Sequence, residues 1–262
     1  MLSLRRCLVL SVSVLVPLWL LVASAPRASA AQLTVAVAAN FAEALDHLKP
    51  EFERDSGHTL RPVVGSTGKL YAQIVNGAPF DVFLSADQER PRRLADAGLA
   101  VAGSRFTYAT GALVLWSADA ARDLQDGAKV LAEKAFRKLA IPNPQLAPYG
   151  VAAQQVLEKL GLWDGLKAHI VMGENVGQTY GLVASGNAEV GFVSKSSVLS
   201  KNTARRGVFW SPDATDHAPI HQDAVLLKRA AQNPAAVAFM TFLKGAAAER
   251  ILERFGYVEE DR

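Results

Sequence analysis

Short apolar runs alternate with helical patterns along most of this chain. The runs have the length and composition of buried strands, and the segments between them repeat apolar residues at the spacing of one helix face. Strands that alternate with helices predict an α/β fold whose parallel sheets are covered on both faces. The expected strands are 33–38, 60–64, 81–85, 106–116, 139–141, 170–172, 190–193 and 219–227, and the expected helices are 41–56, 69–76, 90–97, 151–160, 178–185, 235–243 and 246–255.

The order of these segments predicts two lobes. Two strand–helix sets are separated by one long strand pattern, and a later strand returns before the terminal helices. This order indicates two doubly wound α/β lobes joined by two chain crossings, near Thr107–Gly111 and Asp216–Asp223. We expect residues 31–109 and 219–262 to form one lobe and residues 110–218 to form the other.

Four of the strand-to-helix junctions carry no charge at their tips. A helix start exposes backbone N–H groups and the positive end of the helix dipole, so several starts that converge on one point make a site for an anion. Ligands of open α/β sheets lie beyond the carboxyl ends of the strands, which places this site in the cleft between the lobes. The junctions are Ala39-Asn40, Gly65-Ser66-Thr67, Pro148-Tyr149-Gly150 and Asn175-Val176-Gly177.

Each junction also has a purely structural interpretation. Asn40 and Ser66 are ordinary helix N-cap residues, Tyr149 is a candidate half-buried aromatic residue, and Asn175 is a common turn former. Independent caps do not need to occur twice in each lobe and always after a strand. Their joint placement favours the anion site.

The first thirty residues have the pattern of a secretory signal. Arg5 and Arg6 precede an apolar run, and Ala28-Ser29-Ala30 is a small-residue cleavage pattern. A membrane anchor is the alternative, but Pro17 and the cleavage pattern favour removal of the segment after Ala30. Cys7, the single cysteine, would leave with the signal, so no disulfide is expected in the exported protein.

Removal of this segment also changes the charge balance. Three of the 28 Lys and Arg residues lie in it, which leaves 25 against 25 Asp and Glu residues. A neutral exported chain gives no electrostatic reason to expect binding to nucleic acid or to a membrane surface.

Two partial matches to enzyme motifs fail on inspection. Ser66-Thr67-Gly68-Lys69 fits S-x-x-K, but the other motifs of serine acyl-transfer enzymes are absent from the sequence. The same stretch lacks the first Gly and the Ser or Thr of a phosphate-binding loop, since Val63 and Leu70 stand there. His217 and His221 have H-x3-H spacing without a third evident metal ligand. We therefore expect a protein that is not an enzyme and holds no protein-ligated metal ion.

Several segments, in this order, carry a family resemblance over residues 31–262. The chain resembles the periplasmic molybdate-binding proteins of ABC importers, in the branch with Asn after the first strand. The resemblance implies a type II periplasmic binding-protein fold, whose two lobes close over one tetrahedral oxyanion. It also implies a monomer in the periplasm that works with an inner-membrane ABC permease and its ATPase, without a cofactor. The segments are VAANFAEAL, VNGAPFDVFLSADQ, NPQLAPYG, ENVGQ, AEVGFV and FLKG followed by GYV.

The resemblance also implies the residues that bind the oxyanion. Asn40 and Ser66 match the side-chain donors of the first lobe, and Tyr149 and Val176 match the backbone donors of the second. Three further candidates are Ala39, Thr67 and Ser194. Ala39 stands where this branch can place a Thr, and Ser194 stands where another branch has a Tyr after GFV.

A site made of neutral donors suits a fully deprotonated dianion. Protonated phosphate would leave its O–H unpaired, and sulfate differs from molybdate only in size, so we expect molybdate and tungstate to bind and sulfate to be rejected. Three other functions stay open. They are a receptor of the same fold for another anion such as sulfate, thiosulfate or a phosphonate, a secreted hydrolase, and a receptor for a metal cation.

Overall fold

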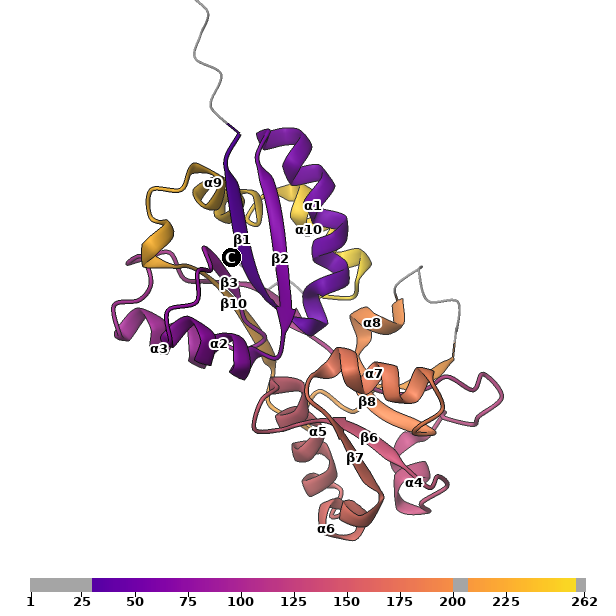
Figure 1. Cartoon of the computed structure of the whole chain (residues 1–262). Coiled ribbons are helices and arrows are strands. Elements are labelled where there is room, and N and C mark those ends of the chain that lie inside the picture. Colours follow the sequence, from indigo (N-terminus) through magenta and orange to yellow (C-terminus); the bar gives the residue numbers. More distant parts are fainter. Residues whose placement is uncertain (1–29, 200–206, 258–262) are drawn as a thin grey trace, which may run out of the picture.

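The chain folds into two lobes, each built on a five-stranded sheet (Figure 1). The computed structural model describes residues 30–199 and 207–257, so nearly all of the expected signal segment lies outside the described residues. Lobe 1 is defined as residues 30–111 with 220–257, and lobe 2 as residues 112–199 with 207–219. Within these ranges no helix is both long and apolar enough to cross a membrane.

In lobe 1, three parallel strands are extended by a pair of strands that run antiparallel to each other. The sheet order is β2-β1-β3-β10-β4, and β10 runs antiparallel to both of its neighbours. The strands are β1 (Gln32–Ala38), β2 (Thr59–Gly65), β3 (Val82–Leu84), β4 (Phe106–Gly111) and β10 (Ile220–Leu226). The helices are η1 (Ala39–Phe41), α1 (Ala42–Ser56), α2 (Thr67–Val75), α3 (Glu89–Asp96), η3 (Lys228–Ala230), α9 (Pro234–Phe242) and α10 (Ala246–Arg254).

Lobe 2 has the same sheet with different strands. Its order is β7-β6-β8-β5-β9, with β6, β7 and β8 parallel and β5 antiparallel to both β8 and β9. The strands are β5 (Leu113–Ser117), β6 (Leu139–Pro142), β7 (Ile170–Gly173), β8 (Val190–Ser194) and β9 (Val208–Trp210). The helices are α4 (Gly127–Ala132), α5 (Pro148–Lys159), α6 (Trp163–Leu166), η2 (Lys167–His169), α7 (Val176–Ala184) and α8 (Lys195–Leu199).

The two sheets therefore correspond strand by strand. β1 and β6 each lie between two parallel neighbours, β2 and β7 are the edge strands beside them, and β3 and β8 lie on their other side. As a result, the junction after β1 corresponds to the junction after β6, and the junction after β2 corresponds to the junction after β7. The four uncharged junctions of the sequence are two equivalent pairs.

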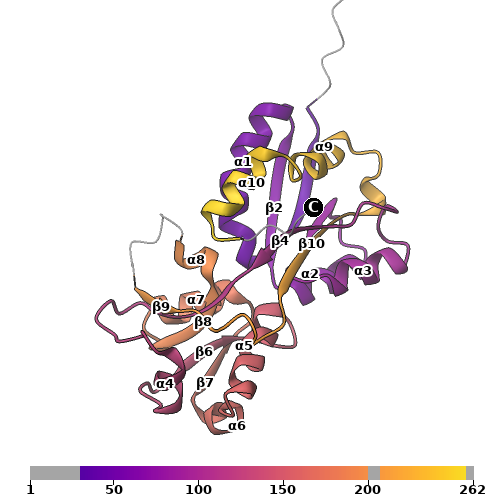
Figure 2. The same ribbon diagram turned by 180° about the vertical axis from the view of Figure 1, so that it is seen from behind.

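The α/β fold and the two crossings agree with the sequence, but the expectation of parallel sheets holds for only three strands in each lobe. The expected strand 106–116 is two strands, because the chain leaves lobe 1 at Gly111 and enters the sheet of lobe 2 at Leu113. The return crossing lies between Trp210 and Ile220. Strands that enter from the opposite lobe run antiparallel to the strands they meet. Figure 2 shows β4 and β10 leading from the upper lobe towards the lower one.

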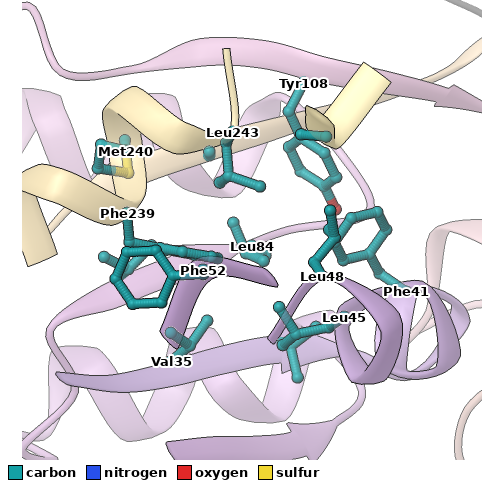
Figure 3. Close-up of a cluster of buried hydrophobic side chains, with 14 of the residues drawn as sticks. Val35, Phe41, Leu45, Leu48, Phe52, Leu84, Tyr108, Phe239, Met240 and Leu243 are labelled. Atoms are coloured by element: carbon teal, nitrogen blue, oxygen red, sulfur yellow. The ribbon is translucent and has the colours of Figure 1, made fainter. Parts of the chain in front are cut away.

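Each lobe has its own apolar core. Alternate residues of β1 pack on opposite faces of the lobe 1 sheet: Val35 and Val37 pack with α1, α9 and α10, whereas Ala36 packs with α2 and α3. Figure 3 shows the first of these clusters, with Phe52 against Phe239 and with Phe41 against Tyr108. A separate cluster fills lobe 2 around Trp116. The lobe 2 cluster also takes in Ala38, Ala86 and Ile220 of lobe 1, so the lobes are packed together where they meet.

Two site helices begin earlier than the sequence pattern indicates. α5 begins at Pro148 and α7 at Val176, whereas apolar periodicity gave 151 and 178. Tyr149 and Val176, in these first turns, are buried with the core of lobe 2, but apolar periodicity alone locates the ends of a helix only to within a few residues. The junction residues are therefore the first residues of these helices.

Candidate anion-binding site

All four junctions line one small cavity between the lobes. The cavity is small, with a free volume of only about 10 Å³, so an extended organic ligand does not fit. Side-chain hydroxyl or amide groups line part of the wall, and none of the described residues in the lining is Asp, Glu, His, Lys or Arg. The lining residues are Ala38, Ala39, Asn40, Gly65, Ser66, Thr67, Ala86, Ala147, Pro148, Tyr149, Asn175 and Val176.

The junctions after β1 and β6 begin helices without a side-chain cap. The N-cap residues are Ala38 and Ala147, which have no side-chain hydrogen-bond acceptor. A helix start in a buried place normally needs acceptors for its first N–H groups. Ala39, Asn40 and Tyr149, which carry such N–H groups, line the cavity.

The junctions after β2 and β7 are capped by side chains. Ser66 Oγ accepts from the Lys69 N–H at 3.4 Å, and Asn175 Oδ1 accepts from the Gln178 N–H at 3.0 Å. Thr67 Oγ1 accepts from the Ala86 N–H at 3.2 Å. A hydroxyl oxygen that accepts in this way still has its own proton to donate. The Ser66 and Thr67 hydroxyls can therefore donate into the cavity.

The backbone N–H groups of Tyr149 and Val176 have no acceptor in the described part of the chain. Tyr149 is the second residue of α5 and Val176 is the first residue of α7, so neither has a partner within its own helix. Tyr149 is 2% exposed and Val176 is 3% exposed, so bulk water does not replace the missing acceptor. Both N–H groups are unpaired donors at the cavity.

Asn40 lies at the cavity, but its side chain is used differently from the expectation. Its Nδ2 donates to Gln222 Oε1 at 2.8 Å and to the Tyr257 hydroxyl at 3.2 Å. These two bonds use both hydrogens of the amide nitrogen. Its backbone carbonyl also accepts from Tyr257 and Ser196. The donor left for a ligand is the backbone N–H, because the side chain ties the junction to its surroundings.

The three further candidate residues differ in whether they line the cavity. Ala39 and Thr67 line the cavity, and Ser194 does not. Ser194 is fully buried at the end of β8, where its hydroxyl bonds to those of Ser196 and Ser197. These bonds hold the turn from β8 into α8 and keep the Ser194 hydroxyl out of the cavity.

Contacts between the lobes surround the cavity. The Gly68 N–H donates to the Leu146 carbonyl at 2.9 Å, and Ser196 Oγ donates to the Asn40 carbonyl at 2.9 Å. Lys69 of α2 pairs with Glu174 of lobe 2, and their side chains are 52% and 28% exposed. The Lys69 ammonium thus bridges the lobes at the edge of the site instead of pointing into the cavity. The structure has the two lobes in contact.

Three buried tyrosines add neutral hydroxyls around the first pair of junctions. Burial raises the pKa of Tyr108, Tyr149 and Tyr257, and the proximity of Tyr257 raises the pKa of Tyr149 further, against hydrogen bonds from Gln222 and Asn40 that lower it. All three phenols stay protonated at neutral pH. Sequence reasoning did not find the roles of Tyr108, Tyr257 and Gln222. The available signal was the run of polar residues His221, Gln222 and Asp223 at the start of the strand β10, where buried positions would usually be apolar.

The geometry does not favour catalysis at Ser66. The Lys69 amino group pairs with Glu174, so the S-x-x-K match has no free lysine beside the serine. The described residues contain no group of three or more His, Cys, Asp or Glu side chains placed to hold a metal ion. His217 and His221 bond to Ala218 and Thr110 respectively.

Comparisons with known proteins identify the family of the chain. The family model described as bacterial extracellular solute-binding protein matches residues 33–258. The chain is 46% identical over 230 residues to the molybdate-binding protein ModA of Azotobacter vinelandii, covering 88% of this chain and 91% of that protein. It is 45% identical over 233 residues to ModA of Rhodobacter capsulatus, covering 89% of this chain and 90% of that protein.

A solved structure gives the same result for the fold. The periplasmic molybdate-binding protein of Azotobacter vinelandii matches with a TM-score of 0.83 and 45% sequence identity, covering 87% of this chain and 100% of that chain. The chain therefore belongs to the bacterial extracellular solute-binding proteins, and within them to the molybdate-binding proteins.

Proposed function

We propose that this protein captures molybdate, and tungstate nearly as well, between its two lobes and delivers it to an ABC permease of the inner membrane and the ATPase that drives it. It acts in the periplasm as a monomer, catalyses no reaction and needs no cofactor. The observation that carries the proposal is the small cavity where four uncharged helix starts meet. The names of its relatives supply the ligand.

The donors of the cavity fit a tetrahedral oxyanion. Ser66 and Thr67 supply hydroxyls, and Asn40, Tyr149 and Val176 supply backbone N–H groups, with the Ala39 N–H beside them. A dianion stripped of water needs a donor for every oxygen, and each hydrogen bond to a charged group contributes about 1.5–3 kcal/mol. The helix dipoles of α5 and α7 add to this attraction.

The same donors determine which oxyanions bind. The oxygens of a fully deprotonated anion meet donors only, whereas a protonated oxyanion would bring an O–H that needs an acceptor. Sulfate has the charge and shape of molybdate at a smaller size, so its oxygens would not reach donors from both lobes at once. Size therefore selects between the two dianions.

Isothermal titration with molybdate, tungstate, sulfate and phosphate tests the proposal. We expect tight binding at one site for molybdate and tungstate, and binding of sulfate and phosphate at least about 100-fold weaker, the loss of one or two bonds to a charged ligand. Sulfate binding as tight as molybdate binding would move the protein to the group of receptors for other oxyanions. Native mass spectrometry of the purified protein identifies the cargo independently, from the isotope pattern of molybdenum.

A further inference from the structure

We infer that Gln222 is a positioning residue that couples the anion site to the hinge. Its side-chain amide connects Asn40 of lobe 1 with Tyr149 of lobe 2, and it does so on one of the two strands that lead from lobe to lobe. The inference rests on the proposed function for its ligand, but Gln222 itself does not line the cavity.

Gln222 lies where the returning chain enters the lobe 1 sheet. It is fully buried, on β10 next to β4, the strand that leads out of lobe 1. The register between β10 and β4 shifts between Gln222 and Asp223. Such an irregularity bends a strand locally and redirects a side chain. The shift therefore falls beside the residue that contacts both lobes.

One amide group serves partners from both lobes. Gln222 Oε1 accepts from Asn40 Nδ2 at 2.8 Å and from the Tyr108 hydroxyl at 3.1 Å, both in lobe 1. Gln222 Nε2 donates to the Tyr149 hydroxyl of lobe 2 at 3.4 Å. Glutamine supplies an acceptor and a donor on one planar group, which neither a carboxylate nor an apolar side chain does.

Gly111, on the crossing that leads out of lobe 1, leaves space for the same contact. A Cβ atom at Gly111 would lie 2.1 Å from the Tyr149 hydroxyl oxygen and 2.5 Å from Gln222 Nε2. Glycine at the end of β4 thus leaves the space in which the Tyr149 phenol meets the Gln222 amide. Gly111 on one crossing and Gln222 on the other thus lie beside the phenol of Tyr149, and Tyr149 lines the cavity.

This arrangement links opening of the lobes to the site. Separation of the lobes withdraws the Tyr149 hydroxyl from Gln222 and leaves a buried amide donor without its partner, which is unfavourable. In the closed form, the same amide holds the first junctions of both lobes at a fixed spacing through Asn40 and Tyr149. Gln222 thereby favours closure and aligns the donors of the cavity without being one of them.

Four variants of the full chain test the coupling: Tyr149→Phe, Gln222→Met, the double variant and Tyr108→Phe. Tyr108 is the matched control, because its hydroxyl bonds to the same Gln222 oxygen from within lobe 1. The measurements are the affinity and dissociation rate of molybdate, the selectivity for molybdate over sulfate, and the Tm without ligand.

We expect Y149F and Q222M each to weaken molybdate binding about tenfold, mainly through faster dissociation, as loss of one buried hydrogen bond implies. The double variant should be no weaker than the weaker single variant, because both changes break the same link. Y108F should lower the Tm and leave affinity within about twofold, because its bond stays within lobe 1. Additive losses in the double variant, or an equal loss of affinity in Y108F, would overturn the inference.

Two further measurements keep the test decisive. G111A introduces a methyl group into the space of the contact without removing either partner, so it should also speed dissociation; an unchanged rate would count against the coupling. Labels at V237C and M172C, two exposed positions in different lobes, report the inter-lobe distance in a C7S background.

The label distances also separate this inference from the proposed function. If the wild-type protein binds no oxyanion, the proposed function fails. The ligand-free distances then still decide the coupling, since Y149F should reduce the closed fraction and Y108F should not. An equal closed fraction in Y149F and the wild type overturns the coupling whatever the ligand is.

Discussion

The two lobes line corresponding halves of the candidate site with partly different chemical groups. Lobe 1 has the hydroxyls of Ser66 and Thr67 beside the backbone N–H of Asn40, whereas lobe 2 has the backbone N–H groups of Tyr149 and Val176. The sheets correspond strand by strand, so the difference does not come from the fold. It shows that a strand-to-helix junction is the shared geometric unit, and that the donor can be either a side chain or the backbone. Substitutions should therefore act on the two lobes in different ways.

The largest effect on molybdate affinity is expected from a substitution that moves the backbone of lobe 2. A Cβ atom at Gly150 would lie 2.4 Å from the Pro142 carbonyl oxygen and 2.8 Å from backbone atoms of the next two residues. Gly150→Ala must therefore displace the first turn of α5 and the Tyr149 N–H with it. We expect molybdate affinity to fall by more than about 100-fold, the loss of two charge-assisted bonds, as measured by titration calorimetry.

Gly181→Ala in the same lobe is the control for this change. Gly181 lies inside α7, and no atom comes within 4 Å of the place that an added Cβ atom would take. The substitution should raise the free energy of unfolding by about 0.5–1 kcal/mol and leave affinity unchanged. If G150A bound molybdate normally, the backbone of α5 would not be part of the site.

The next largest effect on molybdate affinity is expected from removal of a side-chain donor of lobe 1. Ser66→Ala removes a hydroxyl donor and an N-cap together. We expect affinity to fall about 10- to 100-fold, because a hydrogen bond to a charged group contributes about 1.5–3 kcal/mol. Calorimetry with molybdate gives the value.

Asn175→Ala is the matched change in lobe 2, since Asn175 caps α7 as Ser66 caps α2. It should lower the free energy of unfolding by about 1 kcal/mol, the usual contribution of an N-cap, with a smaller loss of affinity than S66A. Equal losses of affinity in both variants would show that capping, and not the Ser66 hydroxyl, accounts for the effect.

A smaller effect is expected from the ion pair that bridges the lobes. Lys69→Gln with Glu174→Gln removes the pair without changing net charge, so it should speed dissociation only a few-fold, as exposed pairs contribute about 0–1 kcal/mol. The Arg93–Glu89 pair lies within α3 and has 53% and 63% exposed side chains. R93Q with E89Q should leave dissociation unchanged. An effect of this second pair would mean that general surface charge is responsible.

The smallest effect on affinity is expected from a change of pH. Among the described residues that line the cavity, Tyr149 alone has a titratable side chain, and burial raises its pKa. Affinity should stay constant between about pH 6 and 9, once protonation of the oxyanion is taken into account. A titration with a midpoint in that range would reveal an ionisable group at the site.

Stability should respond to pH at the alkaline end. A group whose pKa is raised on folding contributes stability that is complete below its unfolded value and is lost as pH rises through its folded value. Tyr108, Tyr149 and Tyr257 are such groups. Urea unfolding should show stability falling above about pH 10, and Tyr257→Phe should make that fall less steep.

Most of the fold follows from local patterns in the sequence. The apolar runs of β1 and β6 and the periodic faces of α1 and α10 mark their elements within a few residues. Gly111 interrupts the strand pattern 106–116, but local patterns do not show that its two halves belong to different sheets. Which sheet a strand joins depends on the returning chain, which lies about a hundred residues later in the sequence.

The residues of the candidate site were easier to predict than the atoms through which each residue would contact a ligand. Uncharged helix starts indicated Asn40, Ser66, Tyr149 and Val176, and all four line one cavity. Sequence could not show that Gln222 and Tyr257 take both hydrogens of the Asn40 amide, because these residues lie 182 and 217 positions away. The roles of the four residues as ligand donors stay predictions until binding is measured.

Under the proposed function, the donors are divided between two lobes, and the protein acts as a chelator that holds the anion from both sides. Each lobe alone presents half of a coordination sphere, and closure raises the local concentration of the second half around an anion already held by the first. Opening needs no change of charge and no proton transfer, because every donor is neutral. A transporter that separates the lobes therefore converts a tight complex into a weak one by geometry alone.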